Sequence, residues 1–159
     1  MEQDKFLRAE LVKLLQGGSA HAGFEKAVAG FPPEFRGRKP EGAAHTAWEL
    51  LEHLRIAQRD MLEFSRDANH KSPPWPEGYW PATPAPPDHA AWEKSVHEFH
   101  HDLAAMRKLV ADPASDLFTP FPHGEGQTLL REALQLADHN AYHLGELVFL
   151  RRLLGAWKS

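Results

Sequence analysis

Apolar residues recur with the spacing of an α-helix in four parts of the chain, and no segment shows the strict alternation of a half-buried strand. This pattern predicts helices over about residues 3–16, 46–65, 88–110 and 128–154. A further turn or two of helix is expected within 20–29, after a break at Gly17 and Gly18. The predicted fold class is therefore all-α.

Capping residues support three of the predicted helix ends. Thr46 and Glu49 form the capping-box pattern "TAWE", in which each side chain bonds a backbone amide at the helix start. Asp88 is a good N-cap after two prolines, and Gly155 is a typical stop signal. The second, third and fourth helices are therefore bounded by recognisable signals.

The connection between the second and third predicted helices, residues 66–87, is long and rich in proline. Proline lacks an amide donor and has a fixed φ, so this segment cannot continue a helix. A link of this length can cross a whole helical bundle, whereas a short one makes neighbouring helices antiparallel. Trp75, Tyr79 and Trp80 suggest that the link packs against the body, either as cover for the core or as a lid over a site.

Length and composition are those of one globular domain over residues 1–159, with 42% hydrophobic and 25% charged residues. The net charge of −4, without a basic patch, argues against a nucleic-acid partner. The chain has no Cys, which excludes a disulfide scaffold, a thiolate zinc site and a Cys nucleophile.

The first residues are charged and amphipathic, which argues against a secretory signal peptide. No stretch approaches the roughly 20 apolar residues of a membrane span. We therefore expect a cytoplasmic protein without a membrane partner, and the absence of Cys fits that compartment.

Two histidine pairs have the four-residue spacing that places both rings on one helix face. At 100° per residue, His97 and His101 lie about 140° and 180° from the centre of their helix's apolar stripe, which predicts a solvent-facing pair. His143 lies within about 20° of the inner stripe of the last helix, and His139 lies about 60° to its side. This second pair is therefore expected to face the interior.

His53 on the second predicted helix lies about 60° from its inner stripe and is the natural third partner of His139 and His143. Burying imidazoles without hydrogen bonds costs a few kcal/mol. A divalent ion would remove that cost, because neutral imidazole binds zinc, nickel, copper and iron well. Core histidines bonded to carbonyl groups remain the alternative. Candidate additional ligands are His21, His45 and His123.

Few side chains could assist such an ion. Glu146 lies on the same side of its helix as His139, where it could act as the catalytic general base, as an outer-shell acceptor or as a partner of an arginine. Glu49 could orient His53 or serve only as the cap partner. Asn140 could bond a ligand of the metal or pack between helices.

The segments "HTAWELLEHLRIAQRDMLEF" and "LREALQLADHNAYHLGELVFLRRLLG" resemble the DinB/YfiT-like superfamily, and "WPEGYWP" and "WEKSVHEFHHDL" resemble one of its subgroups. The resemblance implies a four-helix bundle with a long Pro-rich crossover between helices 2 and 3. It also implies one divalent metal held by His53, His139 and His143, with an open coordination position.

Some members of this family are thiol-dependent S-transferases that use bacillithiol or mycothiol-type cofactors, and others resemble isomerases or hydrolases. The resemblance therefore implies a metal-dependent transferase or hydrolase acting on a small molecule, with a low-molecular-weight thiol as a candidate cofactor. Zinc or nickel is favoured, iron, manganese and cobalt are alternatives, and a homodimer is expected. A non-catalytic, stress-related metal-binding module and a plain helical bundle remain open as alternatives.

Overall fold

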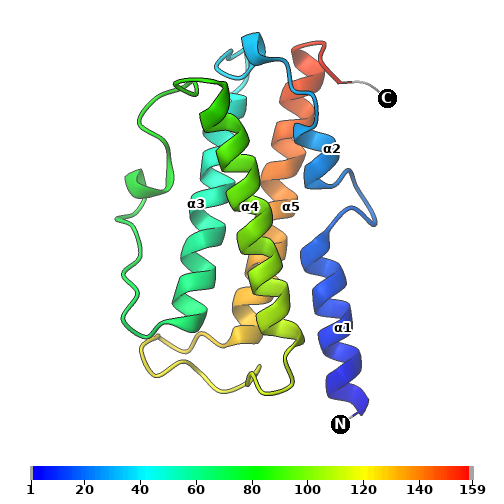
Figure 1. The fold of residues 1–159 in the computed structure, drawn as a ribbon, viewed down its shortest axis with the longest axis vertical. Coiled ribbons are helices and arrows are strands. Elements are labelled where there is room, and N and C mark those ends of the chain that lie inside the picture. Colours follow the sequence, from blue (N-terminus) through cyan, green and yellow to red (C-terminus); the bar gives the residue numbers. More distant parts are fainter. Residues whose placement is uncertain (1, 158–159) are drawn as a thin grey trace.

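The computed structural model describes residues 2–157, and every regular element in that range is helical (Figure 1). The α-helices are α1 (Glu2–Gln16), α2 (Phe24–Val28), α3 (Ala47–Arg66), α4 (His89–Ala111) and α5 (Leu129–Leu153). Two short 3-10 turns, η1 and η2, span Pro33–Phe35 and Glu77–Tyr79. The all-α prediction is confirmed, and the short α2 lies where a further turn of helix was expected.

The four long helices lie side by side along the long axis of the molecule (Figure 1). The link over 67–88 runs back along the length of the bundle, so α3 and α4 point in the same direction. Helix α5 runs the opposite way, and α3 packs against both α4 and α5. Helix α1 covers α4 and α5 from the other side. A long face of α3 is thereby held against a long face of α5.

The helix starts are fixed by side-chain caps. The Thr46 hydroxyl accepts a hydrogen bond from the Glu49 amide at 3.1 Å, and the Thr46 amide donates to the Glu49 carboxylate at 2.7 Å. Asp88 and Thr128 cap α4 and α5 more simply, each accepting one hydrogen bond from the amide three residues further on. These caps fix the residue at which each of the three helices begins.

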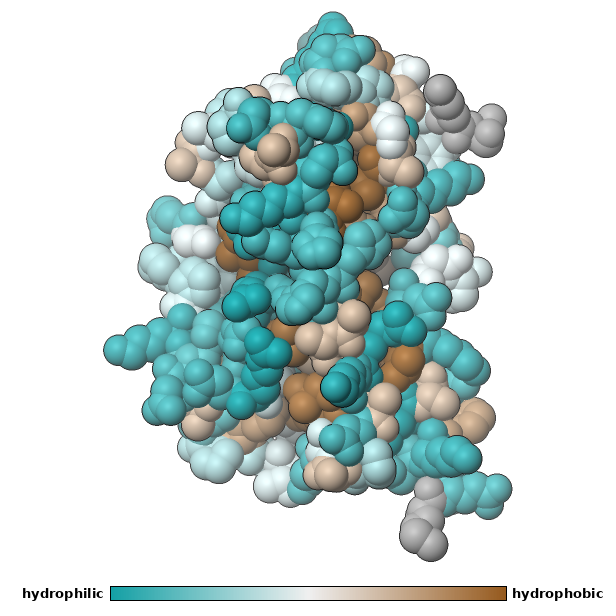
Figure 2. All heavy atoms as spheres, in the orientation of Figure 1, coloured by the Kyte–Doolittle hydropathy of each residue, from teal (hydrophilic) through white to brown (hydrophobic). Residues whose placement is uncertain are grey.

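Two apolar clusters fill the bundle, one toward each end. Trp92 and Phe99 of α4 belong to the first cluster, and Met106 of α4 and Leu136 of α5 to the second. The face that carries α4 is mainly hydrophilic, with hydrophobic atoms visible chiefly between the helices (Figure 2). Among the described residues, no helix combines the length and apolar character that crossing a bilayer requires.

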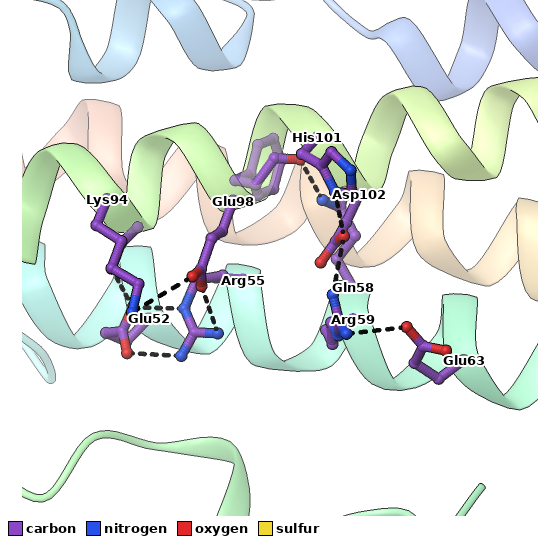
Figure 3. A network of polar contacts seen from close by, with 11 residues as sticks. Glu52, Arg55, Gln58, Arg59, Glu63, Lys94, Glu98, His101 and Asp102 are labelled. Carbon is purple, nitrogen blue, oxygen red and sulfur yellow. Dashed lines mark hydrogen bonds and ion pairs between the residues drawn. The ribbon is translucent and has the colours of Figure 1, made fainter.

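Polar contacts join α3 to α4 along the face of α3 that is turned toward α4 (Figure 3). Arg55 pairs with Glu52 at 2.7 Å and with Glu98 of α4 at 3.2 Å. The buried Gln58 amide donates to the Phe99 carbonyl at 2.7 Å. These contacts fix the rotation of α3 about its own axis, so its remaining inner face is turned toward α5.

Arg151 of α5 is buried and bonds the end of α2. Its guanidinium donates to the carbonyl groups of Ala27 at 2.9 Å, Ala29 at 2.8 Å and Ala156 at 3.0 Å. Carbonyl groups at a helix end have no partner within the helix, so one planar five-donor group satisfies several of them together.

We expect Arg151→Lys to lower the free energy of unfolding by about 1–2 kcal/mol, because a lysine ammonium cannot reproduce the forked set of hydrogen bonds. Urea unfolding followed by circular dichroism measures the change. The neighbouring exposed Arg152→Lys is the matched control and should change stability by less than about 0.5 kcal/mol. Equal effects of the two substitutions would contradict the capping role of Arg151.

Candidate metal centre

Three imidazoles meet between α3 and α5. The Nε2 atom of His53 lies 3.1 Å from Nε2 of His143 and 3.0 Å from Nε2 of His139. One ring nitrogen from each residue lies within 4.8 Å of the other two, a spacing that could hold one metal ion. The pairing of an inward HxxxH on α5 with a histidine of α3 is therefore observed as the helical angles predicted.

The long link covers this cluster. Trp80 stacks on the His53 ring, with centroids 4.0 Å apart and planes within 4°. His45 stacks on the Trp80 ring at 4.1 Å, which places Trp80 between the two imidazoles. His45 is therefore separated from the three-histidine cluster by an indole ring and acts as packing for the link.

Hydrogen bonds at the outer nitrogens define which atoms of the cluster are free to bind a cation. His53 Nδ1 lies 2.9 Å from the Tyr79 carbonyl oxygen, which can only accept, so Nδ1 carries the proton. His143 Nδ1 lies 2.6 Å from the Glu146 carboxylate and is a donor for the same reason. A neutral ring with its proton on Nδ1 has its lone pair on Nε2, and in both residues Nε2 is the atom that faces the centre.

Two lone pairs about 3 Å apart repel each other unless a proton or a cation lies between them. His139 adds a third ring whose Nδ1 is buried and has no partner among residues 2–157. Burial and the nearby His143 and His53 lower the pKa of His139 to about 4. Burial also lowers the pKa of His53. Both rings are therefore neutral at neutral pH, which is the form that binds metal ions.

The predicted helper residues have defined partners. Glu146 bonds the outer nitrogen of His143, an arrangement typical of carboxylates that orient metal-binding histidines. Glu49 is engaged by the Thr46 amide in the capping box. The Asn140 amide group donates to the Gln58 side chain at 3.0 Å and packs between helices. Of the three, Glu146 makes a short hydrogen bond to a ring of the cluster.

The remaining histidines lie elsewhere. His97 and His101 are exposed on α4, as their helical angles predicted. His123 donates to the Phe64 carbonyl at 2.9 Å, and His21 bonds the Ala22 carbonyl at 3.0 Å. Within the described residues, the cluster of three is the one group of histidine or acidic side chains with the spacing of a metal site.

A cavity of about 430 Å³ opens beside the imidazoles and is lined by residues of α3, α5 and the link. Tyr79 donates its hydroxyl to Asp60 at 2.6 Å, and burial together with Asp60 raises the pKa of Tyr79 to about 12. Glu132 also lines the cavity, and Trp75 stands at its rim with 76% of its surface exposed. Sequence reasoning missed Asp60 and Glu132, although each lies seven residues from a predicted ligand and hence on the same helix face.

Comparison with known proteins identifies one family. A sequence model described as the DinB superfamily matches residues 18–147, a range that contains all three histidines. No curated protein matches the chain, and no solved structure matches it.

Proposed function

The chain belongs to the DinB superfamily, and from this premise we propose that it is a metal-dependent enzyme of the thiol S-transferase or hydrolase type. His53, His139 and His143 are the proposed metal ligands. The observation that carries the proposal is the pair of hydrogen bonds at Nδ1 of His53 and His143, which turn both Nε2 atoms toward a common point beside the ring of His139.

Three protein ligands suit a catalytic ion better than a structural one, which is usually closed by four. A divalent ion with an open position lowers the pKa of a water or thiol that occupies it. Neutral imidazole favours zinc or nickel, with iron, manganese and cobalt as alternatives. The adjacent cavity supplies room for a small-molecule substrate, and a low-molecular-weight thiol is the proposed cofactor.

The protein's own groups prepare the site. The Tyr79 carbonyl and the Trp80 ring hold His53 in one orientation, and Trp80 shields that ring from water. Glu146 holds His143 and is proposed as a positioning residue that acts through this ring. The alternative role of Glu146, a general base that touches the substrate, would require it to leave His143.

Metal analysis of protein purified without added ions, combined with thiol binding to cobalt-substituted protein, tests the proposal. We expect about one transition-metal ion per chain and a change in the cobalt absorption spectrum when a thiol is added. Metal-free protein that does not take up cobalt would overturn the metal site. Bound metal without thiol binding or hydrolytic turnover would instead support a non-catalytic metal-binding module. This second candidate is favoured by the hydrogen bond between Glu146 and His143, because it leaves the site without a free general base.

Glu146→Gln is expected to weaken metal binding by about 10–100-fold, because the glutamine no longer provides a charged acceptor for the Nδ1 proton of His143. Competition with a chromophoric chelator measures the affinity. The exposed Glu41→Gln is the matched control and should bind metal as the unmodified protein does. Unchanged metal affinity with lost turnover would show that Glu146 acts as a base and not through His143.

A further inference from the structure

Two carboxyl groups line the cavity at the end away from the imidazoles. Asp60 follows His53 by seven residues on α3, and Glu132 precedes His139 by seven residues on α5. Because the two helices are antiparallel, both steps lead toward the same end of the bundle (Figure 1). Seven helical residues span about 10 Å, so the carboxyl end lies about that far from the histidine end.

The two carboxyl groups differ in their partners. Asp60 accepts hydrogen bonds from His70 Nε2 at 2.7 Å and from the Tyr79 hydroxyl at 2.6 Å. Both Asp60 oxygens are therefore hydrogen-bonded to side chains of the link, which they hold against α3. Glu132 is only 6% exposed, and no side-chain hydrogen bond or ion pair within residues 2–157 involves its carboxyl group. Its oxygens are not among the fully buried polar atoms without a partner, so they are open to the cavity that Glu132 lines. It is thus a buried carboxyl group that lines the cavity without a protein partner.

Such a group has an unfavourable environment in the isolated protein. Burial is the main cause that raises the pKa of Glu132; the neighbouring Arg131 opposes this shift, and the nearby Asp60 carboxyl group adds to it. An uncompensated buried carboxylate destabilises a fold unless a cation or a hydrogen-bond donor reaches it. A ligand with a positively charged donor group would provide that compensation from inside the cavity.

We propose that Glu132 binds the ammonium group of the substrate or thiol cofactor, so that this enzyme acts on amine-bearing small molecules. The inference rests on the proposed function, because it places the reacting end of the ligand at His53, His139 and His143. The ammonium group would lie about 10 Å from that end, at the separation of Glu132 from His139 along α5. Arg131 is exposed and lines the same cavity. The competing outcome is therefore a ligand whose far end is anionic and pairs with Arg131.

A matched set of thiols tests the inference on zinc-loaded protein. The probes are 6-amino-1-hexanethiol, 6-mercapto-1-hexanol and 6-mercaptohexanoic acid, which differ only at the end far from sulfur. Isothermal titration calorimetry should show the amine binding at least about tenfold more tightly than the alcohol, as expected for a hydrogen bond to a charged group. Glu132→Gln should reduce this ratio to about one, whereas the exposed Glu125→Gln should preserve it.

Equal affinities of the amine and the alcohol, a preference for the carboxylate, or an amine preference that survives in Glu132→Gln would each overturn the inference. A second measurement does not depend on the metal. Hexylamine added to metal-free protein should shift the amide NMR signals of residues around Glu132, and the shifts should be absent in Glu132→Gln. If no thiol binds but hexylamine does, the thiol-dependent form of the proposed function fails while the ammonium site stands. If Glu132→Gln keeps the hexylamine shifts, the ammonium site fails.

Glu132→Gln is expected to fold at least as stably as the unmodified protein at pH 8. The folded-state pKa of Glu132 is raised above its unfolded value, so its contribution to stability is favourable at low pH and is lost as pH rises. The neutral glutamine removes that loss. Thermal unfolding at pH 8 should therefore give an equal or higher melting temperature, and a clear decrease would show that Glu132 has a structural partner.

Discussion

Replacing His53 with alanine is expected to reduce bound metal from about one ion per chain to almost none. The Nε2 atom of His53 is the one that lies within 3.1 Å of both other ligand nitrogens, and it is the only proposed ligand from α3. Loss of an outer-shell partner costs about 10–100-fold in affinity, so loss of this direct ligand should weaken binding by more than about 100-fold. Elemental analysis after gel filtration and chelator competition measure both quantities.

The second HxxxH pair provides the control for this experiment. The double substitution His97→Ala and His101→Ala removes the same motif from α4, where both rings are exposed. This variant should keep one ion per chain and the affinity of the unmodified protein. Loss of metal in the His97→Ala and His101→Ala double variant, or retention of metal in His53→Ala, would show that the three-imidazole cluster is not the binding site.

Removing the metal is expected to lower the melting temperature by about 8–16 °C. An ion present at a thousand times its dissociation constant stabilises the folded state by about 4 kcal/mol, and each kcal/mol shifts the melting temperature of a chain of this size by about 2–4 °C. The physical source is the relief of repulsion between the Nε2 lone pairs of His53 and its two neighbours. Differential scanning calorimetry with chelator, and again after zinc is restored, measures the difference.

In His53→Ala the melting temperature should not respond to chelator or zinc, because the site that couples metal to folding is absent. A wild-type melting temperature that is unchanged by chelator would favour the alternative of hydrogen-bonded core histidines. In that case a proton between His53 and its neighbours, rather than a metal ion, would hold the three rings together.

Much of the helical framework could be predicted because periodicity and capping are local properties. The Thr46–Glu49 capping box and the Asp88 cap define helix starts within a few residues of sequence. The same helical angles separate the exposed pair of α4 from the inward His139 and His143 of α5. The inward placement of a side chain on a helix follows from the start and period of that helix, so the positions of these rings too could be predicted.

The surroundings of the cluster could not be predicted in the same way. His53 is oriented by a backbone carbonyl of Tyr79, and every residue has such a group, so no residue type signals it. Glu146 shares a helix face with His139 and His143, but helical angles do not specify side-chain rotamers, so its bond to His143 could not be predicted. The Asp60–Tyr79 bond depends on how an irregular link packs, which is a tertiary property.

The link over 67–88 contributes Tyr79 and Trp80 to the site, whereas all three imidazoles belong to helices. Scaffold and surroundings are thus encoded in separate stretches of chain. Loop closure entropy grows only slowly with loop length, and loops accept substitution more readily than packed helices. Substitutions in this one exposed segment can therefore change the surroundings of the proposed metal centre while the helices that carry the three histidines stay unchanged.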